Sequence, residues 1–196
     1  MGLTLGSSVF LRILKQEKQI EAWVLGDDGR YVLFRTYAIC THSGSLGPKT
    51  REGDQQAPEG FYFVPPSRMN PASSFHLSFD LGYPNVFDRS HGRTGDYLMV
   101  HGACVSIGCY AMTDAVIEEL WVLMDAAFRA GQPFVRAHAF PFAMTEANLA
   151  KEANSPHSEF WGQLAEGWRA FERTGVPPNV VVRGGRYIIE ERTREM

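Results

Sequence analysis

The spacing of apolar and polar residues predicts β-structure in the N-terminal half of the chain. Residues 8–14 form a first apolar run, residues 20–25 alternate in polarity, and a turn signal at 27–30 precedes a candidate strand at 31–40. Apolar runs joined by such a turn are typical of a hairpin or meander. Alternating or continuous apolar residues predict further strands at 61–64, 74–81 and 97–101.

After residue 112 the apolar spacing becomes that of a helix. Residues 113–131 carry this spacing, with Thr113 or Asp114 as the N-cap and Gly131 where a C′ glycine belongs. The later segments read as a strand, a second helix and a terminal hairpin, at 134–140, 158–173 and 180–191. The pattern as a whole predicts a mostly β domain of the α+β class, with its helices late in the chain.

Composition narrows the classes of function. A chain of 196 residues with 44% hydrophobic content can bury one sizeable core. A net charge of −3 without a basic stripe argues against nucleic acid as a partner, and no apolar run is long enough for a transmembrane segment. The first residues lack the charged and apolar regions of a secretory signal, so the chain is either cytosolic or a mature form.

His101 and Cys109 are the main candidates for chemistry. His101 ends the strand predicted at 97–101, and a tight turn followed by a second strand end at Cys109 would bring the two side chains face to face. An imidazole beside a thiol is the arrangement that thiolate catalysis requires. The N–H groups of Gly108, Cys109 and Tyr110 can then form an oxyanion hole. The alternative is a buried, inert cysteine, and the spacing itself leaves both open.

Neighbouring residues have more than one interpretation. Ser106 can donate a hydrogen bond to the imidazole or to an oxyanion, or can simply form a turn. Cys104 completes a His-x2-Cys-x4-Cys spacing, but no fourth ligand is evident and we expect no metal site. In an oxidising compartment Cys40 can pair with Cys104 or with Cys109.

Two loops hold candidate substrate contacts. The polar segment 41–60 is long for a compact domain, which is typical of a functional loop, and Ser43 and Gly44 lie in it. Arg89 and Arg93 precede the 97–101 strand and can clamp a substrate carboxylate. We expect Ser43, Gly44, Arg93 and Tyr110 to be the substrate contacts.

Several motifs together carry a family resemblance. His101-Gly102 followed by Ser106-Ile-Gly-Cys109 resembles the signature of the YkuD-type murein L,D-transpeptidases. The match is closer to the YafK-like branch, through the segments 39–49, 52–60, 82–88 and 109–114. The resemblance runs from about residue 9 to 144. It implies a single catalytic domain over 1–196 with its core at about 9–144 and a helical and hairpin C-terminal extension at 145–196.

The resemblance implies a YkuD-like fold of mixed β-sheets with a cysteine at the base of a cleft. In it His101 corresponds to the catalytic histidine, Cys109 to the nucleophile and Gly108 to the oxyanion loop, with no cofactor. Two departures concern the acyl acceptor. Ile107 replaces the second histidine of the family motif, and Ala111 stands where arginine or asparagine is common.

The YafK-like branch implies a specific reaction. It is hydrolysis of the bond between meso-diaminopimelate and the C-terminal lysine of an outer-membrane lipoprotein. The alternatives are an L,D-transpeptidase or L,D-carboxypeptidase acting on tetrapeptide stems, or a non-catalytic cell-wall binding domain. The implied partners are peptidoglycan stem peptides and wall-linked lipoprotein. The implied location is the periplasm or cell envelope, with the signal sequence removed.

Overall fold

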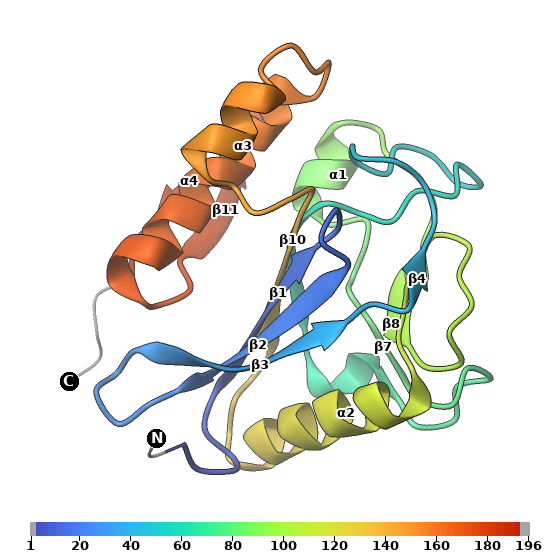
Figure 1. Ribbon diagram of the computed structural model, residues 1–196, viewed down its shortest axis with the longest axis vertical. Helices are drawn as coiled ribbons and strands as arrows, with labels where there is room; N and C mark the ends of the chain where they lie inside the picture. Colours follow the sequence, from blue (N-terminus) through green and yellow to red (C-terminus); the bar gives the residue numbers. More distant parts are fainter. Residues whose placement is uncertain (1–2, 193–196) are drawn as a thin grey trace.

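Two five-stranded sheets organise the computed structural model, which describes residues 3–192 (Figure 1). The first sheet has the order β3-β2-β1-β10-β5, formed by Tyr31–Ala38, Gln19–Leu25, Val9–Leu14, Val135–Phe140 and Gly60–Val64. The second has the order β4-β9-β8-β7-β6, formed by Thr41–His42, Tyr110–Ala111, Met99–His101, Ser78–Asp80 and Met69–Asn70. A 3₁₀ turn, η1, spans Pro66–Arg68.

The strands of the first sheet follow the polarity pattern. β1 is buried along its whole length and is apolar except for Arg12, because a central strand covered on both faces has no side exposed to solvent. β2 alternates between buried and half-buried residues, as the alternation of its sequence predicts. β1 pairs with β2 in antiparallel and with β10 in parallel orientation.

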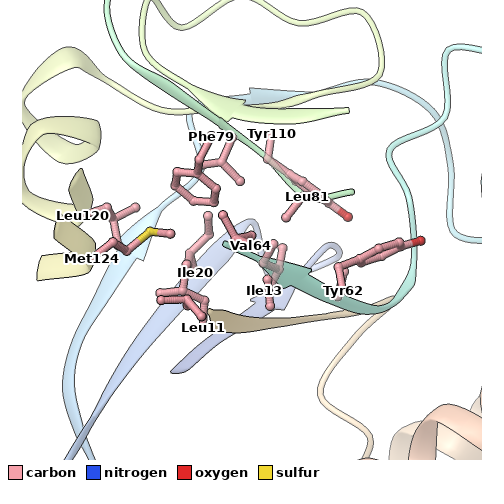
Figure 2. Packing of buried hydrophobic residues seen from close by; sticks show 14 of the residues in the cluster. Leu11, Ile13, Ile20, Tyr62, Val64, Phe79, Leu81, Tyr110, Leu120 and Met124 are labelled. Carbon is pink, nitrogen blue, oxygen red and sulfur yellow. The ribbon is translucent and has the colours of Figure 1, made fainter. Parts of the chain in front are cut away.

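The main hydrophobic core lies between the two sheets (Figure 2). Helix α2 (Asp114–Arg129) closes one end of it. Full burial of one such side chain contributes about 1.5–3 kcal/mol. The side chains that meet there come from both sheets and from α2, and include Leu11, Ile13, Ile20, Tyr62, Val64, Phe79, Leu81, Tyr110, Leu120 and Met124.

The C-terminal segment covers the other face of the first sheet. It consists of α3 (Glu146–Lys151), α4 (Ser158–Thr174), β11 (Asn179–Arg183) and β12 (Arg186–Glu190). A second core cluster joins α4 and β12 to strands β1, β5 and β10. The buried Arg12 of β1 donates to Glu21 and to Glu172 of α4, both at 2.5 Å, and lies 3.8 Å from the ring centre of Trp168. The segment is therefore packed onto the sheet.

The helix prediction at 113–131 is confirmed. α2 spans Asp114–Arg129 with Thr113 at the N-cap, and Gly131 follows with a φ of 103°. That left-handed φ favours glycine. Within residues 3–192, no helix combines the length and apolar character needed to cross a membrane.

Two predictions between residues 74 and 96 are corrected. The strand predicted at 74–81 is reduced to β7 (Ser78–Asp80), because His76 has a φ of 71° and cannot continue an extended strand. The turn-rich segment that follows contains a short helix, α1 (Val86–Ser90). Asn85 accepts from the Asp88 N–H and the Asp88 carboxylate accepts from the Asn85 N–H, which is a capping box.

Candidate active site

His101 and Cys109 lie at the ends of two neighbouring strands of the second sheet. Strands β8 and β9 run parallel, with Val100 opposite Tyr110 and His101 opposite Ala111. Cys109 immediately precedes β9, so the second strand end predicted at Cys109 is the start of β9. The core contains Val100 and Tyr110, and the Cys109 sulfur lies against the backbone of β8, 3.4 Å from the Met99 nitrogen. In the strand register His101 is level with Ala111, two positions beyond Cys109.

The loop 102–109 makes this parallel pairing possible. Parallel strands usually need a connection of a dozen or more residues. Here β8 and β9 have only three and two residues, so the chain has little distance to return. It turns back through left-handed φ values of 64° at Ala103, 54° at Cys104 and 101° at Gly108. The loop is therefore sharply bent at both ends.

One disulfide and two hydrogen bonds hold the bent loop in place. Cys104 is disulfide-bonded to Cys40, with the two Cα atoms 5.4 Å apart. The Asp114 carboxylate at the start of α2 accepts from the Ala103 N–H at 2.8 Å. The Ser106 hydroxyl donates to the Cys109 carbonyl at 2.6 Å, and no hydrogen bond links it to His101 among the described residues. Together they fix the backbone on both sides of Cys109.

The disulfide also decides which thiol is free. The sequence leaves Cys104 and Cys109 as equal partners for Cys40, and the structure pairs Cys40 with Cys104. Cys109 is the free cysteine. Among the three cysteines, it alone can act as a nucleophile or titrate.

His101 is held as a neutral imidazole. The side chain is 2% exposed and lies against Phe75, with ring centres 4.6 Å apart. Its Nδ1 lies 2.6 Å from the Gly102 carbonyl oxygen. A carbonyl only accepts, so Nδ1 carries the proton and Nε2 carries the lone pair. Burial lowers the pKa of His101, and the bond to Gly102 opposes this only in part.

Cys109 is held as a neutral thiol. Its Sγ accepts from the Met99 N–H at 3.4 Å and lies 3.7 Å from the Tyr97 carbonyl oxygen. Burial raises the pKa of the thiol above its ordinary value of 9.0, while the Met99 N–H opposes that shift. No hydrogen bond joins Sγ to His101 in the described part of the chain. The two pKa shifts favour a neutral thiol and a neutral imidazole, the forms in which the thiol proton passes to the imidazole during attack.

One of the three predicted oxyanion donors, the Gly108 N–H, is engaged elsewhere. The Gly108 N–H donates to the Ser43 hydroxyl at 2.5 Å, so the prediction that it is free for an oxyanion does not hold here. Ser43 in turn donates to the Gln55 carbonyl at 2.8 Å. The Tyr110 side chain points into the core and donates to the Pro58 carbonyl at 2.7 Å. The N–H of Cys109 itself has no hydrogen-bond partner among residues 3–192.

Two predicted substrate contacts have structural partners instead. Gly44 has a φ of 87°, and the Gln56 side chain occupies the space that a Cβ would need. Arg93 donates to the buried Asp88 at 2.8 Å with only 9% of its side chain exposed. Neither residue lines the cavity at Cys109.

That cavity is shallow and has a volume of about 260 Å³. Its rim includes two strongly exposed hydrophobic residues, Tyr97 and Ile107. Ile107, which replaces the histidine of the family motif, therefore faces solvent beside the thiol. The full lining consists of Lys49, Glu52, Gly53, Gln55, Gly95, Asp96, Tyr97, Leu98, Ile107 and Cys109.

Two ion pairs that the sequence did not reveal shape the 43–59 loop. Lys15 and Glu59 are fully buried with 3.2 Å between Nζ and Oε1, and Lys15 also donates to the carbonyls of Gly47 and Ala57. Lys49 donates to Asp54 at 2.6 Å. Burial acts to raise the pKa of Asp54, but Lys49 and three backbone N–H groups outweigh it and lower the pKa to about 2. Residues 3–192 contain no group of three or more His, Cys, Asp or Glu placed to hold a metal ion.

Comparison with curated proteins decides the family. The chain is 44% identical over 188 residues to "Putative L,D-transpeptidase YafK" of Escherichia coli strain K12, which covers 95% of this chain and 76% of that protein. The chain belongs to the YafK branch of the L,D-transpeptidases. The protein of the same name in Escherichia coli O157:H7 matches with the same identity and coverage. None of the protein-family models matches the chain. The resemblance seen in the His101–Cys109 segment is confirmed at the level of family, which is one of peptidoglycan-acting enzymes.

Solved structures confirm the fold. Pgp2 from Campylobacter jejuni, described as a helical cell shape determining protein, has a TM-score of 0.54 at 18% identity over 91% of this chain and 76% of its own. Its K307A mutant has a TM-score of 0.55 at 20% identity over 86% of this chain. The chain spans 59% of the length of that mutant structure. These neighbours confirm the predicted α+β, YkuD-like architecture.

Proposed function

We propose that the chain is a cysteine amidase of peptidoglycan that uses Cys109 as its nucleophile and His101 as its base. The bond that it cleaves is the amide between meso-diaminopimelate and the C-terminal lysine of a wall-linked lipoprotein. One observation carries the proposal. The free thiol of Cys109 lies at a cavity one residue before β9, β9 pairs with β8, the strand that ends at His101, and His101 Nε2 carries the lone pair.

The first half of the reaction forms a thioester. His101 Nε2 takes the thiol proton as the Cys109 sulfur attacks the diaminopimelate carbonyl carbon. The carbonyl π-electrons move to oxygen, and the Cys109 N–H stabilises that oxyanion. When the C–N bond breaks, the His101 imidazolium returns its proton to the departing lysine amine. Cys109 is left as an acyl-enzyme.

Water completes the reaction. His101 accepts a proton from the attacking water, the C–S bond breaks, and the thiolate recovers that proton. The products are a stem peptide with a free diaminopimelate carboxylate and a released lipoprotein lysine. Ser106 serves in both halves as a positioning residue, because its bond to the Cys109 carbonyl fixes the peptide plane next to the nucleophile.

An L,D-transpeptidase is the second candidate, because the curated relative carries that name. The acylation step is the same, and an amine replaces water as the acceptor. An L,D-carboxypeptidase differs in removing the terminal residue of a tetrapeptide stem. The candidates therefore differ in leaving group and acceptor rather than in the roles of His101 and Cys109.

Product analysis by mass spectrometry separates these functions. The enzyme is incubated with lipoprotein-linked muropeptides and, separately, with disaccharide-tetrapeptide. Release of lipoprotein peptide ending in free lysine is the expected result. Cross-linked dimers would instead identify a transpeptidase, and tripeptides a carboxypeptidase. Cys109→Ala, with the Cys40–Cys104 disulfide intact, is the matched control and should abolish turnover. Wild-type release by that variant would overturn the proposal.

A non-catalytic wall-binding domain is tested by thiol reactivity. A functional nucleophile should be alkylated by iodoacetamide in the native protein, and substrate should protect it. Cys40 and Cys104 supply internal controls, because a disulfide does not alkylate. We further propose a periplasmic or cell-envelope location, which the disulfide and the wall substrate both support.

A further inference from the structure

A second cavity lies apart from Cys109 and has no part in the proposed reaction. Its volume is about 560 Å³, and it shares no lining residue with the cavity at the thiol. Phe61 and Phe63 of β5 line it together with Phe134, and three successive residues of β11, 180–182, line it as well. A volume of this size lies within the usual range for ligand sites.

The edge of β11 that borders the cavity has unpaired backbone groups. Gly184 and Gly185, with φ values of 56° and 72°, form a two-residue turn between the paired residues Arg183 and Arg186. The two residues that flank such a turn, here Arg183 and Arg186, form hydrogen bonds with each other, and along the hairpin the opposed pairs then alternate between hydrogen-bonded and non-hydrogen-bonded. The N–H and C=O groups of residues 180 and 182 therefore point away from β12. No described residue bonds to them, and β11 has no second neighbouring strand.

The facing edge of β5 is closed. Asn85 Nδ2 donates to the Phe61 carbonyl at 2.9 Å, and Arg68 Nη1 donates to the Phe63 carbonyl at 2.5 Å. Side chains thus cap the carbonyls that an incoming strand would use. Pairing is available on the β11 side of the cavity, whereas β5 offers apolar rings.

The charge at the cavity has one sign. Arg68 and Arg89 line it, and no Asp or Glu among residues 3–192 does. Each guanidinium donates to backbone carbonyls, Arg68 to Phe63 and Arg89 to Pro84, and neither forms an ion pair with a described residue. Guanidinium groups beside an apolar surface are complementary to a carboxylate carried on an apolar chain.

We propose that this cavity binds an extended peptide segment of a partner protein, with apolar side chains at alternate positions and a carboxylate at one end. The segment adds to β11 as a third strand and bonds to the free groups of Val180 and Val182. Its inward side chains contact the half-buried rings of Phe63 and Phe134, and its carboxylate binds Arg68 and Arg89. A free strand edge of this kind is a template for such pairing.

The test measures fluorescence polarisation of a fluorescein-labelled heptapeptide, Thr-Val-Thr-Val-Thr-Val-Glu, with the full chain. Val182→Pro removes an N–H that faces away from β12 and so leaves the hairpin bonds in place. Arg89→Glu reverses one charge. We expect each variant to weaken binding by roughly tenfold or more, from the loss of a strand or charge-assisted hydrogen bond. Arg129→Glu, a charge reversal on α2, should leave the affinity within about twofold of wild type.

Controls separate docking from misfolding. Circular dichroism and retained reactivity of the Cys109 thiol show that each variant is folded. A version of the peptide with N-methylated valines should not bind. Amide hydrogen exchange of the wild-type protein supplies an independent readout, because the peptide should protect the N–H groups of Val180 and Val182. Absence of saturable binding, equal affinity for folded Val182→Pro, or unchanged exchange at these amides would each overturn the proposal.

Discussion

The Cys40–Cys104 disulfide should be a major source of stability. Replacing both cysteines by serine opens a covalent loop with a sequence separation of 64 residues. The loop-entropy relation for a loop of this length gives a loss of about 4 kcal/mol in the free energy of unfolding at 25 °C. The loss should also reach the site, because Cys104 lies in the bent loop between His101 and Cys109.

The assay is urea denaturation followed by tryptophan fluorescence. Cys109→Ala serves as the reference protein, so that no free thiol can exchange with the disulfide. The Cys40→Ser, Cys104→Ser variant is made in that background, and the two free energies of unfolding are compared. Dithiothreitol should destabilise the reference protein by a similar amount and should leave the serine variant unchanged.

Two results would show that the Cys40–Cys104 disulfide does not stabilise the protein in this way. One is a difference of less than about 1 kcal/mol between the two proteins, well below what closing a loop of this length gives. The other is a thiol titration of denatured, unreduced wild-type protein that finds three thiols. The structure predicts one thiol, that of Cys109.

Three further predictions concern the site and its supports. Burial lowers the pKa of His101 and raises that of Cys109, and turnover needs a neutral imidazole and one proton shared by the pair. The profile of kcat/KM against pH should therefore be a broad bell that falls on the acid side only below pH 6.5 and on the alkaline side only above pH 9.0. An acid limb above pH 6.5 would contradict the lowered pKa of His101. Ser43→Ala removes the acceptor of the Gly108 N–H, so it should lower the free energy of unfolding in urea by about 1–2 kcal/mol and should also lower kcat. Ser43→Thr should restore both quantities. An unchanged kcat in Ser43→Ala would show that this hydrogen bond does not position the site. Glu59→Gln leaves the buried Lys15 ammonium without a counter-charge and should cost about 3–5 kcal/mol, which Lys15→Met in the same chain should partly recover.

Local patterns were sufficient for much of the fold. β1, β2 and α2 are long enough for their burial to be visible in the order of apolar and polar residues, as a continuous run in β1, an alternation in β2 and helical spacing in α2. The termini of α2 also carry recognisable capping residues. The short helix α1 had a signal in its capping box, with Asn85 three residues before Asp88. That motif could have been detected in a segment that was otherwise typical of turns.

The geometry of the site depends on contacts that sequence spacing does not encode. β8 and β9 have three and two residues, too few for periodicity to reveal that they run parallel. The contact of Ser43 with Gly108 joins residues 65 positions apart. The choice of Cys104 over Cys109 as the partner of Cys40 likewise depends on where the bent loop places each sulfur. The motif points to His101 and Cys109 as the candidate reacting groups, whereas long-range contacts determine how these residues are held.

If Cys109 is the nucleophile, it carries the acyl group during turnover. This intermediate can be sought by mass spectrometry of enzyme quenched in acid during reaction with lipoprotein-linked muropeptide. We expect a stem-peptide adduct on the proteolytic fragment that contains Cys109, labile to hydroxylamine as a thioester is. The adduct should be absent from Cys109→Ala, which should also release no lysine-terminated peptide. Full turnover by Cys109→Ala would show that Cys109 is not the nucleophile.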